Sequence, residues 1–373
     1  MLTSRRGLMK TGAAVAGAVA AGLSARAGSP SAAAAGVPLL HVTDLFHPHG
    51  DPDDHFDLAV AYALAQRGSF DLRGVVIDYP PEFRAGDPAV AAVAQMNRLA
   101  GLAVPVAIGT SLKLKSRKDA LPEAPAQETA ADRFIRAQLR AAQRPVALVC
   151  VGNAADIVIA ALRDPELFKA KCAGVFLNSG SAHDNPSSPK QLEFNVRLDP
   201  SAYAAMFDLP CPLFWFPCWH TTEQRLSGAD GSFYWLPHRE ALADLSSGLA
   251  NYFAYLFDKS VNPKWLRAMT AMPPGPLWQT ILGGKRGMWS TASQFAAAGL
   301  GVTKEGKIVP AREAGDAAVF KLTPVQIACA DDGRTTWKRS EKETGRWMLA
   351  VTDVASYPSA MTRAVAELFK TLG

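Results

Sequence analysis

From residue 37 onward the chain alternates short, continuously apolar runs with longer stretches of helical periodicity. This alternation constrains the fold more than any other feature. Unbroken apolar runs are typical of strands buried on both faces, and strands joined through helices form parallel sheets. We therefore expect an α/β fold with a Rossmann-like, mostly parallel sheet and helices on both faces. The expected strands are 37–43, 72–77, 104–108, 146–151, 174–177 and 212–216, and the expected helices are 56–66, 88–102, 128–142 and 155–163.

The start of the second expected helix carries a specific capping signal. Asp87 is followed by Pro88, which predicts an aspartate N-cap with proline in the first helical position.

Ligands of open parallel sheets bind beyond the carboxyl ends of the strands. The segments that follow the expected strands are therefore the candidate site. These segments are 44–54, 78–81, 151–156, 178–195 and 217–222.

Composition excludes several classes of protein. The chain has 373 residues, with 39 Lys+Arg against 34 Asp+Glu, for a net charge of +5. Arg5, Arg6, Lys10 and Arg26 supply +4 of this, so the remainder is close to neutral at 5 − 4 = +1. Such a body lacks the basic surface that nucleic acid requires. The 5 cysteines form no C-x-x-C pair that would indicate zinc or redox chemistry.

The N-terminus has the form of a targeting signal. Arg5, Arg6 and Lys10 precede an uncharged Ala/Gly/Val run, and the paired arginines resemble a twin-arginine export signal. The apolar stretch of 15 residues before Arg26 is shorter than the ~20 needed to span a bilayer, which favours a cleaved leader over an anchor. We expect residues 1–36 to be a signal peptide and linker. The twin-arginine machinery would export the protein to the periplasm or beyond, with no stable membrane association.

The loop after the first strand is strongly acidic. Asp44, Asp51, Asp53 and Asp54 lie within 11 residues. Clustered carboxylates repel one another, and oxygen ligands favour Ca²⁺, or alternatively Mg²⁺, over zinc. The alternative is a solvated turn whose aspartates cap the next helix. Four histidines occur in the same region, but their spacing matches no zinc motif. They are His41, His47, His49 and His55.

The acidic loop resembles a stretched form of the Asp-x-Asp-Pro-Gly-x-Asp-Asp fingerprint of the inosine–uridine-preferring nucleoside hydrolases. Further segments resemble the family in order, over about 37–225. The most specific is Glu193-Phe194-Asn195 followed by Asp199-Pro200, similar to Glu-Phe-Asn-x-x-x-Asp-Pro-x-Ala. The others are 72–77 with Asp78, 104–110, 147–160 and 176–180. The chain is identified as a divergent, exported member of this family, with a nucleoside hydrolase-like domain over 37–373.

The resemblance implies a role for each matching residue. Asp44 and Asp54 would hold Ca²⁺ together with the backbone carbonyl of Val151, and Asp44 would also accept a proton from the attacking water. The residues expected to bind substrate are Asp53, Asp78, Asn185, Glu193, Asn195 and Ser290. For Glu193 and Asn195 the alternative is a surface loop, and for Asn185 it is a turn.

The C-terminal third departs from the family. Trp289 and Ser290 stand where the family has a His-Asp pair, and a serine hydroxyl is a weaker ligand than a carboxylate. His220 and His238 are then the candidates for the acid that protonates the leaving base. Residues 226–285 are a candidate helical cap. The aromatic residues considered for base stacking are Trp215, Phe216, Trp219, Tyr234 and Trp235.

Three functions fit these features. The first is metal-dependent hydrolysis of the N-glycosidic bond of ribonucleosides, giving base and ribose. The second is a degenerate relative that binds a sugar or nucleoside without turnover. The third is a hydrolase of another glycosidic substrate. The residues leave open whether the chain forms a homo-oligomer.

Overall fold

The computed structural model describes residues 36–50, 52–79, 86–183, 192–221, 225–259, 264, 266 and 269–373. The strands of the main sheet are β1 (Val37–Thr43), β3 (Phe70–Ile77), β5 (Val106–Ile108), β6 (Val146–Cys150), β7 (Cys172–Asn178), β8 (Leu213–Phe216), β13 (Phe320–Cys329), β14 (Thr335–Arg339) and β15 (Arg346–Val351). The short strands are β2 (Phe46–His47), β4 (Asp87–Pro88), β9 (Tyr234–Pro237), β10 (Lys285–Met288), β11 (Leu300–Val302) and β12 (Ile308–Pro310).

The helices of the described chain include two long ones next to the first strand, α2 (Asp53–Gln66) and α3 (Val90–Ala100). The middle of the chain contributes η1 (Ala126–Thr129), α4 (Ala130–Ala141), α5 (Ala155–Arg163), α6 (Pro165–Lys171), α7 (Phe194–Leu198) and α8 (Pro200–Met206). The remaining helices are α9 (His238–Leu242), α10 (Ser247–Asp258), α12 (Gly275–Leu282), α13 (Thr291–Ala297), α14 (Ala311–Ala314), η3 (Gly315–Ala317) and α15 (Tyr357–Phe369).

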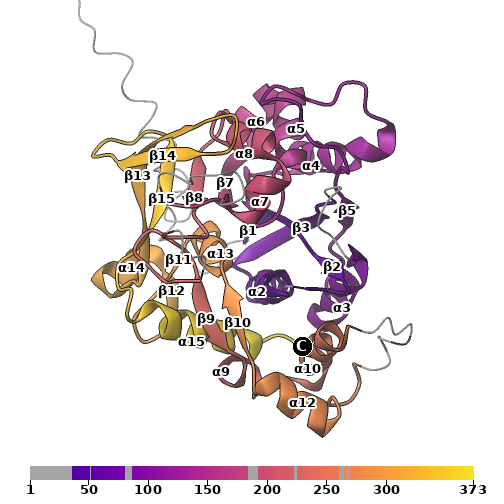
Figure 1. The fold of residues 1–373 in the computed structure, drawn as a ribbon. Helices are drawn as coiled ribbons and strands as arrows, with labels where there is room; N and C mark the ends of the chain where they lie inside the picture. The colour runs from indigo at the N-terminus through magenta and orange to yellow at the C-terminus, as the bar shows by residue number, and fades with distance from the viewer. Residues whose placement is uncertain are drawn as a thin grey trace, which may run out of the picture.

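Nine strands form one sheet in the order β14-β13-β15-β8-β7-β6-β1-β3-β5. In Figure 1 the C-terminal strands β13, β14 and β15 lie at the left and β3 and β5 at the right. The pairs from β15 through β8 to β5 are all parallel. Within this sheet the antiparallel pairs are those of β13 with β14 and with β15. The expected mostly parallel sheet is confirmed, and each of the six expected strands overlaps an observed one.

Each face of the sheet has its own hydrophobic core. Helices α4, α5, α6 and α8 cover one face, above the sheet in Figure 1, and α2, α3, α13 and α15 cover the other. Neighbouring residues of β1 enter different cores: Leu39 faces α2, whereas Leu40 and Val42 face α4 and α5. Because both faces are covered, the strands are continuously apolar rather than alternating.

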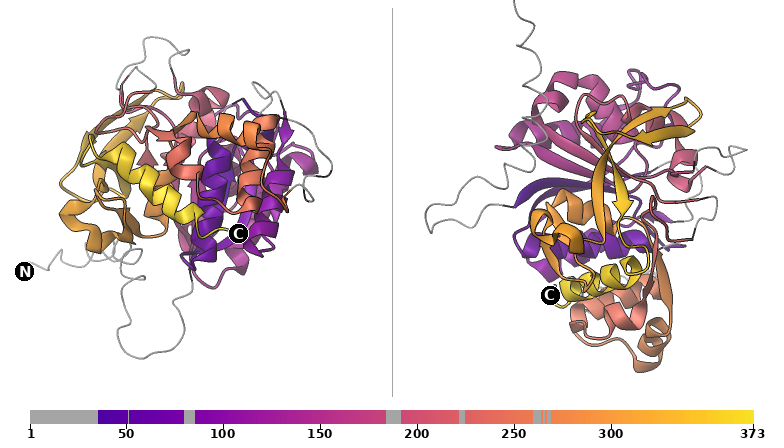
Figure 2. Two further views of the ribbon diagram at one scale, coloured as in Figure 1. Left: turned by 90° about the horizontal axis from the view of Figure 1, so that it is seen from below. Right: turned by 90° about the vertical axis from the view of Figure 1, so that its left-hand side faces the viewer.

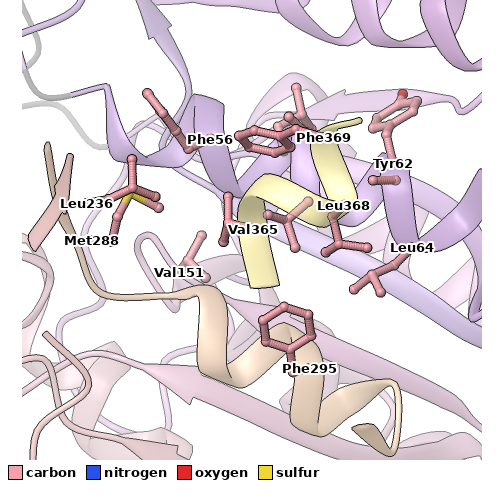
Figure 3. Close-up of a cluster of buried hydrophobic side chains, with 14 of the residues drawn as sticks. Phe56, Tyr62, Leu64, Val151, Leu236, Met288, Phe295, Val365, Leu368 and Phe369 are labelled. Carbon is pink, nitrogen blue, oxygen red and sulfur yellow. The ribbon is translucent and has the colours of Figure 1, made fainter. Parts of the chain in front are cut away.

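Helices from the two ends of the described chain pack together. Figure 2 shows α15 beside α2, and in Figure 3 Phe56 of α2 lies next to Phe369 of α15. Their ring centroids are 6.2 Å apart. Val365 and Leu368 of α15 and Phe295 of α13 belong to the same cluster. This packing holds the start of α2, with its aspartates, against the sheet.

The predicted N-cap at Asp87 is wrong. Helix α3 begins at Val90, and Ala89 occupies the cap position without a side-chain hydrogen bond. Asp87 and Pro88 instead form β4, which pairs antiparallel with β2. The short β2–β4 pairing extends the backbone at these residues, so the capping signal in the sequence is overridden by a tertiary contact.

The candidate cap, residues 226–285, packs against the helical layer that contains α2. The hydroxyl of Tyr252 on α10 donates to the backbone oxygen of His55 at 2.9 Å. His47 also stacks on Tyr255 at a centroid separation of 4.8 Å. Helix α10 therefore supports the acidic loop from the side of α2.

The predicted leader lies outside the described residues, apart from residue 36. Within the described ranges, no helix has both the length and the apolar character needed to cross a membrane.

Candidate active site

A cavity of about 390 Å³ opens where β1, β6, β7 and β8 end. This is the carboxyl edge of the parallel strands, as expected for an open α/β sheet. Its walls are formed by Asp44, Phe46, His49, Gly50, Asp53, Asp54, Val151, Asn178, Glu193, Phe194, Asn195, Arg197, Cys218, Trp219, Arg225, Trp289 and Ser290. Cavities of about 300–1,000 Å³ are typical of small-molecule sites.

The structure brings most of the predicted site residues together in this cavity. Seven of them line it: Asp44, Asp53, Asp54, Val151, Glu193, Asn195 and Ser290. Asp78 does not line it, and Asn185 lies outside the described residues.

Asp44, Asp53 and Asp54 form an acidic cluster in the cavity wall. All three are buried, with exposed fractions of 8%, 9% and 5%. Asp54 accepts a hydrogen bond from Thr43 Oγ1 at 3.2 Å. Burial, followed by the charges of Asp44 and Asp53, raises the pKa of Asp54 well above its usual range. The cluster is therefore a site of unfavourable negative charge that a proton or a cation would relieve.

A fourth carboxylate, Asp57 on α2, lies behind the cluster and is fully buried. Burial raises its pKa to about 7, and hydrogen bonds from Ser290 and Thr291 oppose the shift. The Thr291 hydroxyl donates to Asp57 Oδ1 at 3.3 Å. Ser290 thus lies at the predicted position, next to an aspartate that the sequence patterns did not single out.

The Glu-Phe-Asn segment, residues 193–195, forms the part of the cavity wall next to the end of β6. The Glu193 carboxylate accepts hydrogen bonds from Ser179 Oγ and from the backbone nitrogens of Gly180, Asn195 and Val196. Asn195 donates from Nδ2 to the backbone oxygen of Val151 at 3.1 Å. Glu193 therefore organises the start of α7, and the Asn195 side chain joins α7 to the backbone of Val151.

Asn178, the last residue of β7, is a cavity residue that sequence reasoning missed. Its Nδ2 donates to the Phe216 carbonyl at 2.9 Å and to Ser232 Oγ at 3.1 Å. These bonds fix the amide orientation, and Oδ1 has no partner within the described chain. Asn178 could have been recognised from the sequence because it follows an expected strand, and the ligands of open parallel sheets bind beyond the carboxyl ends of the strands.

The aromatic lining differs from the residues considered for base stacking. Of those, only Trp219 lines the cavity, and it is joined by Phe46, Phe194 and Trp289. Trp215 and Phe216 are fully buried in the sheet, and Tyr234 packs edge-on against Tyr357. Aromatic residues for a flat base are thus present, but none of them belongs to a strand of the main sheet.

Neither candidate for the leaving-group acid reaches the cavity. His220 Nδ1 accepts from the backbone nitrogen of Asp230 at 3.3 Å, and His238 pairs with the Ile281 carbonyl at 2.8 Å. Among the described residues, His49 is the imidazole that lines the cavity. It stacks on Phe46 at 4.3 Å and meets His55 edge-on at 4.9 Å. The stretched acidic loop is what carries His49 into the site.

Asp78 has a structural position next to the cavity. Its Oδ2 accepts a hydrogen bond from the backbone nitrogen of Asn153 at 2.5 Å, which closes the turn between β6 and α5. A Cβ at Gly152 would lie 2.5 Å from the same oxygen, so the turn requires glycine there. The carboxylate is used to hold this turn.

The oxygen atoms in the cavity wall decide whether a cation could bind there. In the described part of the chain, no three or more Asp, Glu, His or Cys side chains are arranged to hold a metal ion. Asp44 and Asp54 are nonetheless buried together, and each disfavours the other's charge. Two carboxylates and the Val151 carbonyl are hard oxygen donors that suit Ca²⁺ or Mg²⁺. The residues fit a cation held by two carboxylates and completed by water, rather than a closed cage of side chains.

The parallel sheet, the helices on both faces and the acidic cavity at the carboxyl edge define an α/β protein of the nucleoside hydrolase-like class. The model of the inosine-uridine preferring nucleoside hydrolase family matches residues 50–345, and the chain belongs to that family. The match begins after Asp44, in the stretched loop. The comparison with curated proteins finds no match.

Solved structures share the fold at low identity. A purine-preferring ribonucleoside hydrolase from Gardnerella vaginalis is 16% identical, with a TM-score of 0.54 over 89% of this chain and 99% of that one. A plant nucleoside hydrolase, PpNRh1, is 15% identical, with a TM-score of 0.53 over 88% and 99%. The type III effector protein XopQ, solved with adenosine diphosphate ribose, is 14% identical, with a TM-score of 0.53 over 98% and 100%.

Proposed function

We propose that this chain is a metal-dependent N-glycosidase that hydrolyses ribonucleosides to base and ribose. The observation that carries the proposal is that seven residues chosen for this chemistry, from four separate segments, line one cavity. The family and the fold support N-glycosidic hydrolysis in general.

Each role follows from the position of the residue. Asp44 and Asp54, with the Val151 carbonyl, would hold Ca²⁺, or Mg²⁺ in its place. When bound, the cation supplies positive charge that lowers the pKa of a neighbouring water. Asp44 is buried beside Asp54 and accepts the proton from the attacking water. Asp53 and Asn195 bind ribose hydroxyls.

The reaction requires the water oxygen to bond to the anomeric carbon while the carbon–nitrogen bond breaks. The electron pair of that bond passes to the base, which then takes up a proton. His49 is placed to supply that proton because it lines the cavity. The rings of Trp219 and Trp289 line the same cavity and offer flat surfaces for the base.

The deciding experiment is an assay of the mature protein with inosine, uridine and nitrophenyl riboside, with Ca²⁺ and with a chelator. We expect release of base that depends on the cation and is abolished in Asp44→Asn. Asp71→Asn is the matched control, because Asp71 is an exposed residue of β3 paired with Arg73 at 3.2 Å, away from the cavity. Ligand binding without any base release would support the non-hydrolytic alternative.

We also propose that the protein acts outside the cytoplasm after removal of its leader. The support is the paired arginines, the short apolar run and the small-residue exit within residues 1–36. Mass spectrometry of the exported protein should place its first residue between Gly28 and Val37. An intact Met1 in the exported pool would refute this proposal.

A further inference from the structure

Two arginines line the cavity in addition to its carboxylates. Arg197 belongs to α7, and Arg225 lies in the segment between β8 and β9. Both are exposed, and in the part of the chain that the structure describes neither side chain forms an ion pair or a hydrogen bond. Each guanidinium lies over an aromatic ring, Arg197 over Phe194 and Arg225 over Trp235, both at 5.7 Å.

By contrast, two arginines of this protein outside the cavity hold the fold. Arg163 bonds to the Asp132 carboxylate and to two backbone carbonyls, and Arg346 bonds to the Phe207, Leu209 and Cys211 carbonyls. Within the described residues, Arg197 and Arg225 form no such bonds to backbone carbonyls or carboxylates. An arginine that rests on an aromatic face keeps its donors in a defined plane and available to an anion.

The position of Arg197 relates it to the sugar. Its side chain lines the same cavity wall as that of Asn195, which is a proposed ribose-binding residue. A group attached to the ribose through a hydroxyl at this wall would therefore lie near the guanidinium. An anionic group would also be repelled by the acidic cluster, Asp44, Asp53 and Asp54. The two charge sets would orient the ligand, with the glycosidic bond toward the acidic cluster and the anion toward the arginines.

We propose that the preferred ligand is a phosphorylated riboside, in which Arg197 and Arg225 bind the phosphate, rather than a neutral ribonucleoside. This inference rests on the proposed function for the position of the sugar. Planar guanidinium groups bind phosphate oxygens through paired, charge-assisted hydrogen bonds. A neutral nucleoside offers the two arginines only uncharged acceptors, whose hydrogen bonds are weaker than those of a phosphate.

The first test measures binding without turnover. Isothermal calorimetry of the mature protein compares ribose 5-phosphate with ribose, with inorganic phosphate and adenosine diphosphate ribose as further probes. We expect ribose 5-phosphate to bind at least about tenfold more tightly than ribose, since each charge-assisted contact contributes strongly. Arg197→Gln and Arg225→Gln should each weaken this binding by about tenfold. If adenosine diphosphate ribose binds more tightly than ribose 5-phosphate, the anion that the two arginines bind is a diphosphate. If inorganic phosphate binds as tightly as ribose 5-phosphate, the sugar contributes nothing to binding and the inference is overturned.

The matched control is Arg239→Gln, an exposed arginine of α9 that contacts Gln279 and does not line the cavity. It should leave the binding of ribose 5-phosphate unchanged, and all three variants should unfold at the parental temperature. The inference is overturned if ribose 5-phosphate binds no better than ribose, or if it binds both cavity variants as tightly as it binds the parental protein.

A parallel assay separates this inference from the proposed function. Release of base is compared for inosine and inosine 5′-monophosphate, and the phosphorylated substrate should have the higher kcat/KM. If ribose 5-phosphate binds through the arginines but neither substrate is cleaved, the hydrolase proposal fails and phosphate recognition stands. If inosine is cleaved and the phosphate gives no advantage in either assay, the hydrolase proposal stands and this inference is overturned.

Discussion

The side-chain amide of Asn195 donates to the backbone oxygen of Val151 at 3.1 Å, which ties the start of α7 to the end of β6. The bond makes Val151, whose carbonyl is the proposed cation ligand, part of the same wall as the proposed ribose site. A carbonyl oxygen has two lone pairs, so it can accept from Asn195 and still face a cation. Since Nδ2 is the bonded atom, Oδ1 is left as the acceptor for a ligand hydroxyl.

Asn195→Asp should test this link. The substitution replaces a donor with a carboxylate oxygen that faces the Val151 carbonyl, so we expect a loss of about 1–3 kcal/mol in the free energy of unfolding and a higher KM. Urea unfolding and steady-state assays measure the two effects. Asn251→Asp is the control: Asn251 also donates to a backbone carbonyl, that of Ser247, but lies outside the cavity. It should cost stability without changing KM, and an equal rise in KM in both variants would contradict the role of Asn195.

Asp54→Asn should have opposite effects with and without a cation. Because burial, followed by the charges of Asp44 and Asp53, raises the pKa of Asp54, replacing its carboxyl group with a neutral amide should raise the melting temperature in chelator. In excess Ca²⁺ the wild type should gain about 2.7 kcal/mol at a hundredfold excess over Kd, and the variant should gain little. Thermal unfolding with and without Ca²⁺ checks this, with Asp71→Asn as the control. A wild type indifferent to both Ca²⁺ and chelator would refute the cation assignment.

Ser290→Asp should tighten cation binding. The new carboxylate would stand beside the acidic cluster and add charged oxygen to the site, and ligand charge tunes Ca²⁺ affinity strongly. We expect at least a tenfold lower Kd, about 1.4 kcal/mol, in calorimetric titration. The same variant should melt at a lower temperature in chelator, because Asp57 is next to it. Ser290→Ala removes the hydroxyl without adding charge and should not tighten binding; similar affinities in the two variants would show that residue 290 does not face the cation.

Asn178→Ala should weaken both the fold and the site. It leaves the Phe216 carbonyl without its donor, at a cost of about 1–3 kcal/mol, and removes an acceptor from the cavity wall. We therefore expect a lower free energy of unfolding together with a higher KM. Ser232→Ala removes another partner of Asn178 without altering the lining, so it should leave KM unchanged. A KM that is unchanged in Asn178→Ala would exclude contact with the substrate.

Asp156→Asn should change the pH dependence of stability. Burial raises the pKa of Asp156 from 3.8 to about 7. Between pH 3.8 and pH 7 the Asp156 carboxyl group is therefore protonated in the folded protein and ionised in the unfolded chain. The contribution of Asp156 is therefore fully present below about pH 4 and is lost as pH rises to 7. Asparagine keeps the oxygen that accepts from the Thr110 backbone nitrogen. The variant should match the wild type near pH 4 and exceed it above pH 7 by at most about 4 kcal/mol in denaturant unfolding; a difference independent of pH would contradict this.

Several parts of the site were predictable because their signals are local. Asp44 directly follows a buried strand, and Asp53 and Asp54 open the next helix, so their joint position at the sheet edge follows from the chain order. Glu193 and Asn195 were recognised from a contiguous motif. The helix start near Asp87 was mispredicted because its partner strand, Phe46–His47, lies about 40 residues away in the sequence.

The sequence by itself determined the parallel sheet, its two covered faces and the edge that carries the acidic cluster. Periodicity and apolar runs are properties of neighbouring residues. A strand that is buried on both faces is continuously apolar, so its burial can be read from a short stretch of sequence. Only the tertiary structure decided that Asn178, His49, Arg197 and Arg225 share one cavity, and that Asp78 closes a turn beside it. The wall of a cavity is made by segments far apart in the chain, and which side chains meet there depends on how the helices and loops pack together.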